Sequence, residues 1–330
     1  MNNALKMSRV QASVIADPCR GQVIWKPSKS IWILGMYTGA IVGGWLTFSW
    51  QVFVLFAVTS IFTLCAGHSV GMHRRLIHNS FSCPKWLEYT LVYFGALVGL
   101  AGPFSIIYMH ELRDWSQRQH RCHDYFASRQ PLAKDWFWLL NCDIRLDYPP
   151  TIRYEARIAD DRFYHLLEKT RFLQQIPWAV LFYLMFGWGG VFWGICMRVS
   201  ICTTGHWLMG YFAHRWGQRQ WDVVGAGVQG YNVPGFGLLT MGECWHNNHH
   251  AFPDSAQLGV GKGQSDPGWW FICLLEKLGL VWDVQQPTTI SASSKLIRLP
   301  IAQPPLSNSI QLFNRANYLR RKYCPFRQGL

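Results

Sequence analysis

The sequence of 330 residues is poor in charge: charged residues make up 15% of it and apolar residues half. Its 10 cysteines include no C-x-x-C pair, which argues against a finger-type zinc site and predicts a reduced, disulfide-free chain. No long apolar run precedes Ile31, so we expect no signal peptide. With 18 Trp, this composition is atypical of a soluble enzyme and typical of a chain partly surrounded by lipid.

The net charge of +13 is concentrated at the two ends of the chain. Residues 1–30 hold five basic residues and one acidic residue, and residues 288–330 hold seven basic residues and no acidic one. We therefore expect a basic cytosolic arm over 1–30 and a basic cytosolic tail over 288–330, both near anionic lipid headgroups. Nucleic-acid binding is the competing interpretation, but no DNA-binding motif accompanies the charge, so we expect no nucleic-acid partner.

Apolar segments predict an all-α integral membrane domain over 31–287. Its four transmembrane helices form two hairpins, 31–48 with 52–70 and 172–186 with 191–206. An 18-residue helix is about 27 Å long, close to the thickness of the hydrocarbon core. The segment 87–107 is interrupted by glycines and Pro103 and is predicted to be interfacial or re-entrant. Residues 108–171 and 207–287 then form a cytosolic helical cap.

The strongest candidate for a metal site is the stretch from Glu243 to His250. His246, His249 and His250 stand at i, i+3 and i+4, so a helical turn presents all three imidazoles on one face. Neutral imidazoles that converge in this way are typical ligands of a transition metal. Glu243 could accept the outer N–H of one ligand and fix its tautomer.

A second segment repeats this spacing. His120, His123 and Asp124 again stand at i, i+3 and i+4, with a carboxylate in the last place. Imidazole together with carboxylate suits iron or manganese better than copper(I).

The other histidines give weaker signals. His73 and His78 are five residues apart, so an ideal α-helix cannot aim both at one point; they serve two metals or the helix deforms. His206 is predicted at the cytosolic end of the last membrane helix. Single histidines are more often structural than metal-bound, and we assign His110, His165 and His214 to that class.

These segments resemble the histidine boxes of the integral-membrane fatty acid desaturases, specifically the Δ9-type branch that acts on acyl-CoA or acyl lipids. The resemblance covers about residues 31–285. The matching residues are His73 and His78 for H-x4-H; His120, Arg121, His123 and Asp124 for H-R-x-H-H; His246, Asn247, His249 and His250 for H-N-x-H-H; and His206 before Gly210-Tyr211 for a further ligand.

The resemblance implies two iron ions at the cytosolic face, O2 as co-substrate and the insertion of a cis double bond, of Δ9 type, into a long acyl chain. The implied ligands are His73, His78, His120, His123, Asp124, His206, His246, His249 and His250, with Glu243, Asn247 and Arg121 around them. It also implies the bilayer, an acyl-CoA or acyl-lipid substrate and a separate electron donor of cytochrome b5, ferredoxin or rubredoxin type. The protein would be multi-pass, with the active site and both termini cytoplasmic.

Two residues depart from the family pattern. Asp124 stands where the second box has a histidine, and Cys202 stands where the acyl-CoA branch has an asparagine four residues before the further ligand. Either change could alter the iron spacing and with it the choice between desaturation and hydroxylation, and a lipid or alkane hydroxylase is the second hypothesis. A haem-binding membrane cytochrome and a family member that binds metal or lipid without turnover are the alternatives from other classes.

Overall fold

The computed structural model describes residues 9–290 and 293–300. The chain divides into a large unit, Met1–Ile297, and a C-terminal unit, Arg298–Leu330. Most of the basic tail predicted for 288–330 and the first eight residues of the N-terminal arm lie outside the described residues. The fold below is that of the large unit.

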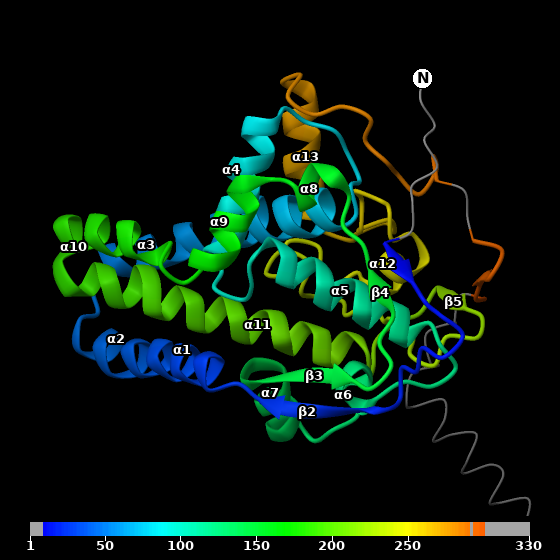
Figure 1. Ribbon diagram of the computed structural model, residues 1–330. Helices are drawn as coiled ribbons and strands as arrows, with labels where there is room; N and C mark the ends of the chain where they lie inside the picture. Colours follow the sequence, from blue (N-terminus) through cyan, green and yellow to red (C-terminus); the bar gives the residue numbers. More distant parts are fainter. Residues whose placement is uncertain (1–8, 291–292, 301–330) are drawn as a thin grey trace, which may run out of the picture. The chain divides into compact units, whose positions relative to one another are not determined.

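Two predicted membrane hairpins form the helical half of this unit (Figure 1). Their elements, in chain order, are α1 (Pro27–Thr38), η1 (Gly39–Gly43) and α2 (Gly44–Leu46); α3 (Trp50–Phe62) and η2 (Thr63–Ile77); and α10 (Gln175–Val191), η3 (Phe192–Met197) and α11 (Arg198–Ala213). The first hairpin turns at residues 47–49, where Ser49 caps α3 by accepting the backbone N–H of Val52. The second hairpin turns at Gly187, whose φ of 59° and ψ of −152° interrupt the helix.

Two continuous helices are long and apolar enough to cross a membrane, Trp50–Ile77 and Gln175–Ala213. The second contains both arms of the hairpin that turns at Gly187. Large apolar side chains on these helices and on α2 point outward, including Trp45, Val58 and Leu184, which are 85%, 59% and 76% exposed. Apolar exposure of this extent marks a surface that contacts lipid rather than water. The protein is therefore a helical membrane protein.

The remaining elements cover one end of these helices. The helices are α4 (Lys85–Ala96), α5 (Pro103–Gln117), α6 (Asp124–Ala127), α7 (Leu132–Asn141), α8 (Ala156–Ala159), α9 (Arg162–Thr170), α12 (His246–Ala251) and α13 (Pro267–Lys277). The strands are β1 (Val10–Gln11), β2 (Gly21–Trp25), β3 (Cys142–Leu146), β4 (Thr151–Ile152), β5 (Trp221–Val223) and β6 (Leu296–Arg298). β1 pairs with β4, and β2 pairs antiparallel with β3 from Gly21 opposite Leu146 to Trp25 opposite Cys142. Residues 10–25 of the predicted N-terminal arm are thus part of the folded unit.

The segment predicted to be interfacial forms two helices that are separated by a break. α4 ends at Ala96, α5 begins at Pro103, and Gly99 in the connection has a φ of +85°. α4 packs so closely on η2 that two glycines of η2 have no room for a side chain. A Cβ at Gly67 would lie 2.4 Å from the Phe94 backbone, and a Cβ at Gly71 would lie 2.5 Å from the Leu91 backbone. The break lets α5 turn back across the end of η2.

Candidate metal centre

Two groups of histidines converge inside the protein. Cluster A consists of His73, His78, His110 and His249; cluster B consists of His214, His246 and His250. Within each cluster, one ring nitrogen from every histidine lies within 4.8 Å of those of the others. The seven residues come from four separate parts of the chain: the end of η2, α5, the end of α11 and α12.

The winding of η2 brings the first two histidines together. The backbone N–H of His78 donates to the carbonyl of His73 at 3.0 Å, an i→i+5 bond of the π-helical type. This looser winding places residues five apart one above the other, whereas an α-helix would turn them away from each other. The two ring centroids are 4.9 Å apart. Of the alternatives left open by the sequence, a deformed helix is the one observed.

The short helix α12 supplies both clusters. Nε2 of His246 lies 3.0 Å from Nε2 of His214 and 3.1 Å from Nε2 of His250, so the i, i+4 pair belongs to cluster B. His249, at i+3, points instead to cluster A, with its ring centroid 4.6 Å from that of His73. The three histidines expected to share one face therefore divide between two adjacent sites.

α5 and α11 each contribute one histidine. Nε2 of His110 lies 3.3 Å from Nε2 of His78. His214 directly follows α11, and its Nδ1–H donates to the carbonyl of Gly210 at 2.7 Å. Because Nδ1 of His214 carries the proton of this bond, Nε2 keeps its lone pair, which is directed into cluster B.

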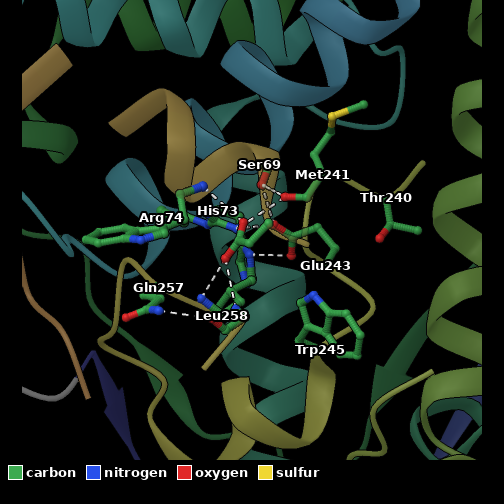
Figure 2. A network of polar contacts seen from close by, with 12 residues as sticks. Ser69, His73, Arg74, Thr240, Met241, Glu243, Trp245, Gln257 and Leu258 are labelled. Carbon is green, nitrogen blue, oxygen red and sulfur yellow. Dashed lines mark hydrogen bonds and ion pairs between the residues drawn. The ribbon is translucent and has the colours of Figure 1, made fainter. Parts of the chain in front are cut away.

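A carboxylate supports cluster A from outside (Figure 2). Oε2 of Glu243 lies 2.7 Å from Nδ1 of His73, and Oε1 of Glu243 accepts a hydrogen bond from the Ser69 hydroxyl at 2.6 Å. The buried Arg74 lies beside this group and donates to Asp266 at 2.7 Å. Glu243 therefore orients His73 with Nε2 toward the cluster.

Burial keeps several of these imidazoles neutral. Burial lowers the pKa of His110 and of His250 to about 4, and lowers the pKa values of His246 and His249 well below their usual range. Although burial alone would raise it, the pKa of Glu243 is lowered to about 2, chiefly by His73. At neutral pH His110, His246, His249 and His250 are therefore unprotonated and Glu243 is ionised, which is the state that metal binding requires.

One further carboxylate lies near both clusters. Asp114 follows His110 by one turn of α5, and its negative charge acts on both His110 and His250. Burial would raise the pKa of Asp114, but the charges of His110, Arg118 and His250 lower it. Asp114 is thus an acidic side chain whose charge reaches one histidine of each cluster.

The second predicted segment does not reach either cluster. Residues 118–123 form no helix, and the backbone N–H of His123 donates to the carbonyl of Pro18. α6 begins only at Asp124, with Nδ1 of His123 capping its Tyr125 N–H, so the expected i, i+3, i+4 face never forms. Asp124 instead accepts a hydrogen bond from Gln130. His120 is exposed, and neither cluster contains these residues.

Three other predicted residues also lie outside the clusters. α11 continues past His206 to Ala213, so His206 lies within the helix, beside His68. Arg121 is exposed. Asn247 points away from the clusters and binds the backbone of Trp221 and Gly230, which fastens α12 to the segment before it.

His110 and His214 are the members of the clusters that we assigned to a structural role from the sequence. Asp114 follows His110 at i+4 on a continuous helix, and this spacing could have indicated His110 as a candidate metal ligand. His214 lies two α-helical repeats of four residues after His206, so it shares a face with His206 and ends the same helix. Because both are single histidines, spacing rules that depend on pairs did not select them.

The donor set fits two transition-metal ions. Nitrogens at ~2 Å from one metal lie ~3 Å apart, which matches the 3.0–3.3 Å separations within the clusters. Buried Nδ1 atoms of His110 and His249 have no hydrogen-bond partner among the described residues. Closely packed imidazoles without protons between them are unfavourable unless a cation draws them together.

Comparison with known proteins decides the family. The profile of the fatty acid desaturase family matches residues 48–258, which span both clusters. The chain belongs to the fatty acid desaturase family. It is therefore a fatty acyl desaturase, an oxidoreductase, and membership implies a diiron centre and O2.

Curated relatives agree with this assignment. The chain is 33% identical over 249 residues to the sn-2 palmitoyl-lipid 9-desaturase of Nostoc sp. (strain 36), covering 73% of this chain and 84% of that protein. It is 32% identical over 260 residues to the acyl-CoA C20 Delta5-desaturase of Anemone leveillei, covering 74% and 77%. It is 31% identical over 279 residues to the sn-1 stearoyl-lipid 9-desaturase of Anabaena variabilis, covering 82% and 97%.

Proposed function

We propose that this desaturase introduces a cis double bond of the Δ9 type into a long acyl chain carried by a lipid or by CoA. The observation that carries the proposal is the convergence of seven imidazoles from four parts of the chain. Relatives named for position 9 of lipid-linked chains, and one named for an acyl-CoA chain, support this substrate class.

The proposed iron ligands are the histidines of clusters A and B. If His110 opens the second histidine box, then Arg113 and Asp114 stand at the places where H-R-x-H-H has histidines. Cluster B would then have three imidazoles, and Asp114 is the available oxygen donor. If His214 rather than His206 is the further ligand, the position four residues before it is Gly210, and a glycine whose carbonyl holds His214 would stand where the acyl-CoA branch has an asparagine.

When bound, the two irons supply O2 activation and the removal of two hydrogens from an unactivated methylene pair, chemistry that no side-chain acid or base can perform. The residues of this chain provide the environment. Glu243 and the Gly210 carbonyl fix the tautomers of His73 and His214. His249 and Asn248 on α12 are buried, so this side of the centre would be shielded from water.

The proposed topology has four membrane-spanning arms, α1–α2, α3–η2, α10 and η3–α11, with α4 at the interface. Its support is the outward-facing apolar surface of these helices and the reversals at residues 47–49 and Gly187. The centre would lie at the cytoplasmic face with both termini, since basic residues favour that side. Electrons would come from a separate donor protein.

A hydroxylase reaction at the same centre is the second candidate, favoured by Arg113 and Asp114 at the places of two histidines. Purified protein should contain about two irons per chain, and His249→Ala should remove most of them. Gas chromatography of acyl chains after expression tests the reaction. A new double bond supports desaturation, a new hydroxyl group supports hydroxylation, and an unchanged profile with no bound iron would overturn both.

A further inference from the structure

A buried ion pair lies beside the contact between Glu243 and His73 and has no part in the chemistry described so far. Arg74 and Asp266 are each 1% exposed, and Nη2 of Arg74 donates to Oδ1 of Asp266 at 2.7 Å. Removing two charges from water is costly, so a buried ion pair often stabilises a fold no better than apolar side chains would. A pair in this position therefore calls for a role other than stability.

The pair packs against both chain segments that meet at the carboxylate–histidine contact. Arg74 directly follows His73 on η2, and its Nη2 also donates to the carbonyl of Met241 at 3.2 Å (Figure 2). Gly242, the next residue, has a φ of +93° and has no room for a Cβ beside Oδ1 of Asp266. The residue after this glycine is the supporting carboxylate, so the ion pair reaches it from the side.

Asp266 is held in place independently of Arg74. Its Oδ1 caps α13 by accepting the backbone N–H of Trp269 at 3.0 Å. Its Oδ2 accepts the backbone N–H groups of Leu258 and Gly259 at 2.8 and 2.9 Å. Because three backbone groups fix this carboxylate, it determines where the guanidinium lies and does not follow it.

Arg74 has a second carboxylate within reach. Its Nη2 lies 3.9 Å from Oε1 of Glu243, which is too far for a hydrogen bond. Its Nε and Nη1 are buried and have no hydrogen-bond partner in the part of the chain that the structure describes. A displacement of about 1 Å would convert the long contact into a charge-assisted hydrogen bond. Without Asp266, Arg74 would make this move, because a buried guanidinium requires an anionic partner.

We propose that Asp266 is a positioning residue for the metal centre, which holds Arg74 away from Glu243 so that the negative charge of Glu243 stays directed at His73. This inference rests on the proposed diiron site and concerns how strongly that site holds its metals. A carboxylate that binds the outer N–H of a ligand imidazole raises the basicity of that ligand. Sharing the carboxylate with a guanidinium weakens this effect and leaves an uncompensated positive charge beside the metal cations.

The test compares two single variants of the full-length protein, stripped of metal in detergent and titrated with Co²⁺ against a competing chelator. Asp266→Asn frees Arg74 to bind Glu243, so we expect the affinity for Co²⁺ to fall by about ten- to hundredfold. Arg74→Gln removes the competing cation, so the affinity should fall by less than about tenfold. The ligand-field absorption of bound Co²⁺ should shift in Asp266→Asn and stay unchanged in Arg74→Gln, because it reports the donor strength of the imidazoles.

The double variant Asp266→Asn/Arg74→Gln separates positioning from a merely structural role. Removing the guanidinium should restore most of the affinity that Asp266→Asn loses, whereas two lesions in a structural pair would not compensate each other. Glu88→Gln, which breaks another buried ion pair of η2, is the matched control. It should bind Co²⁺ as tightly as the wild type does, even where its stability is lower.

Three results would overturn the proposal: unchanged affinity in Asp266→Asn, a loss of tenfold or more in Arg74→Gln, or a double variant that binds no better than Asp266→Asn. If Asp266→Asn does not fold, the affinity of Arg74→Gln decides alone. Failure of the proposed function would appear differently, because the wild-type protein would then bind no Co²⁺ or would form no double bond.

Discussion

Helix α12 contributes histidines to both clusters, but the residues that support the two clusters differ. Cluster A has four histidines, and its His73 is backed by the carboxylate of Glu243, which is itself fixed by Ser69. Cluster B has three histidines, and within residues 9–290 and 293–300 its hydrogen-bond support is the backbone carbonyl of Gly210, which holds His214. Cluster A therefore has more side-chain support than cluster B.

The difference indicates a division of roles. A site with four imidazoles and an ionised outer partner holds its metal firmly, whereas a site with three imidazoles leaves room for another ligand. Asp114, whose charge acts on His110 of cluster A and on His250 of cluster B, lies where it could complete the second site. Substitutions that affect cluster A and cluster B should therefore change iron binding and activity to different extents.

The largest effect is expected from His249→Ala. It removes one of the four imidazoles of cluster A, and loss of a direct ligand should exceed the ten- to hundredfold effects of outer partners. We expect iron to fall to about one per chain or less, and desaturation to fall by more than about a hundredfold. Iron analysis and product quantification are the measurements, with His165→Ala as the control. Retention of two irons would show that His249 is not a ligand.

A large loss of stability is expected from Glu88→Gln, on the far side of cluster A. Glu88 is 1% exposed and contacts Arg75 at 2.5 Å, next to the histidine face of η2, and it accepts from Tyr164 at 2.5 Å. Removing its charge leaves Arg75, whose side chain is 11% exposed, without this carboxylate partner, which costs about 3 kcal/mol. Thermal unfolding of the purified variant measures this cost. A Tm equal to that of the wild type would mean that the ion pair contributes little.

A smaller effect is expected from Glu243→Gln, which keeps the shape of the side chain but weakens its hold on Nδ1 of His73. We expect iron affinity to fall by about ten- to hundredfold. The affinity is obtained by titration with a competing chelator. The companion substitution Ser69→Ala, which removes the hydroxyl donor to Glu243, should have less effect. Equal affinities for wild type and Glu243→Gln would remove the support assigned to cluster A.

Acid should destabilise the metal-free protein through both clusters. The pKa values of His110 and His250 lie near 4 in the folded state, against 6.5 for the free side chain. Between these values the unfolded state binds more protons, so the free energy of unfolding falls as the pH decreases from about 6.5 to 4. Glu243, with a pKa of about 2, stays ionised throughout this window. Chemical denaturation at several pH values measures the slope, and a flat profile would contradict it.

The smallest effect is expected from His120→Ala and His123→Ala. Both residues lie outside the clusters, in the segment where the chain leaves α5. We expect iron content to be unchanged in both variants and activity to stay within about twofold for exposed His120. Replacing His123, which is half-buried and caps α6, should in addition cost about 1 kcal/mol of stability. Loss of iron in either variant would restore the ligand set first inferred from the spacing of histidines.

Much of the fold could be predicted from the sequence. Apolar runs with no charge predict the hairpins, and Gly187 and Ser49 mark turns that the structure confirms. The break before Pro103 follows from its glycines. These features depend on local composition and backbone chemistry, which a single sequence reports directly.

Which histidines converge in the two clusters was harder to predict, because it depends on where helices begin and end. The spacing of His120, His123 and Asp124 is suggestive only if residues 120–124 are helical, and the chain is not helical there. His206 and His214 lie on the same face of α11, and only the length of that helix decides which one reaches the clusters. The boundaries of short elements are the least predictable feature of a sequence.

The most direct test of this account is the position of the metals. Anomalous scattering at the iron edge from crystals of the iron-loaded protein should give two peaks. One should lie among His73, His78, His110 and His249, and the other among His214, His246 and His250. A peak bound by His120 or His123, or one peak alone in fully active protein, would contradict the account.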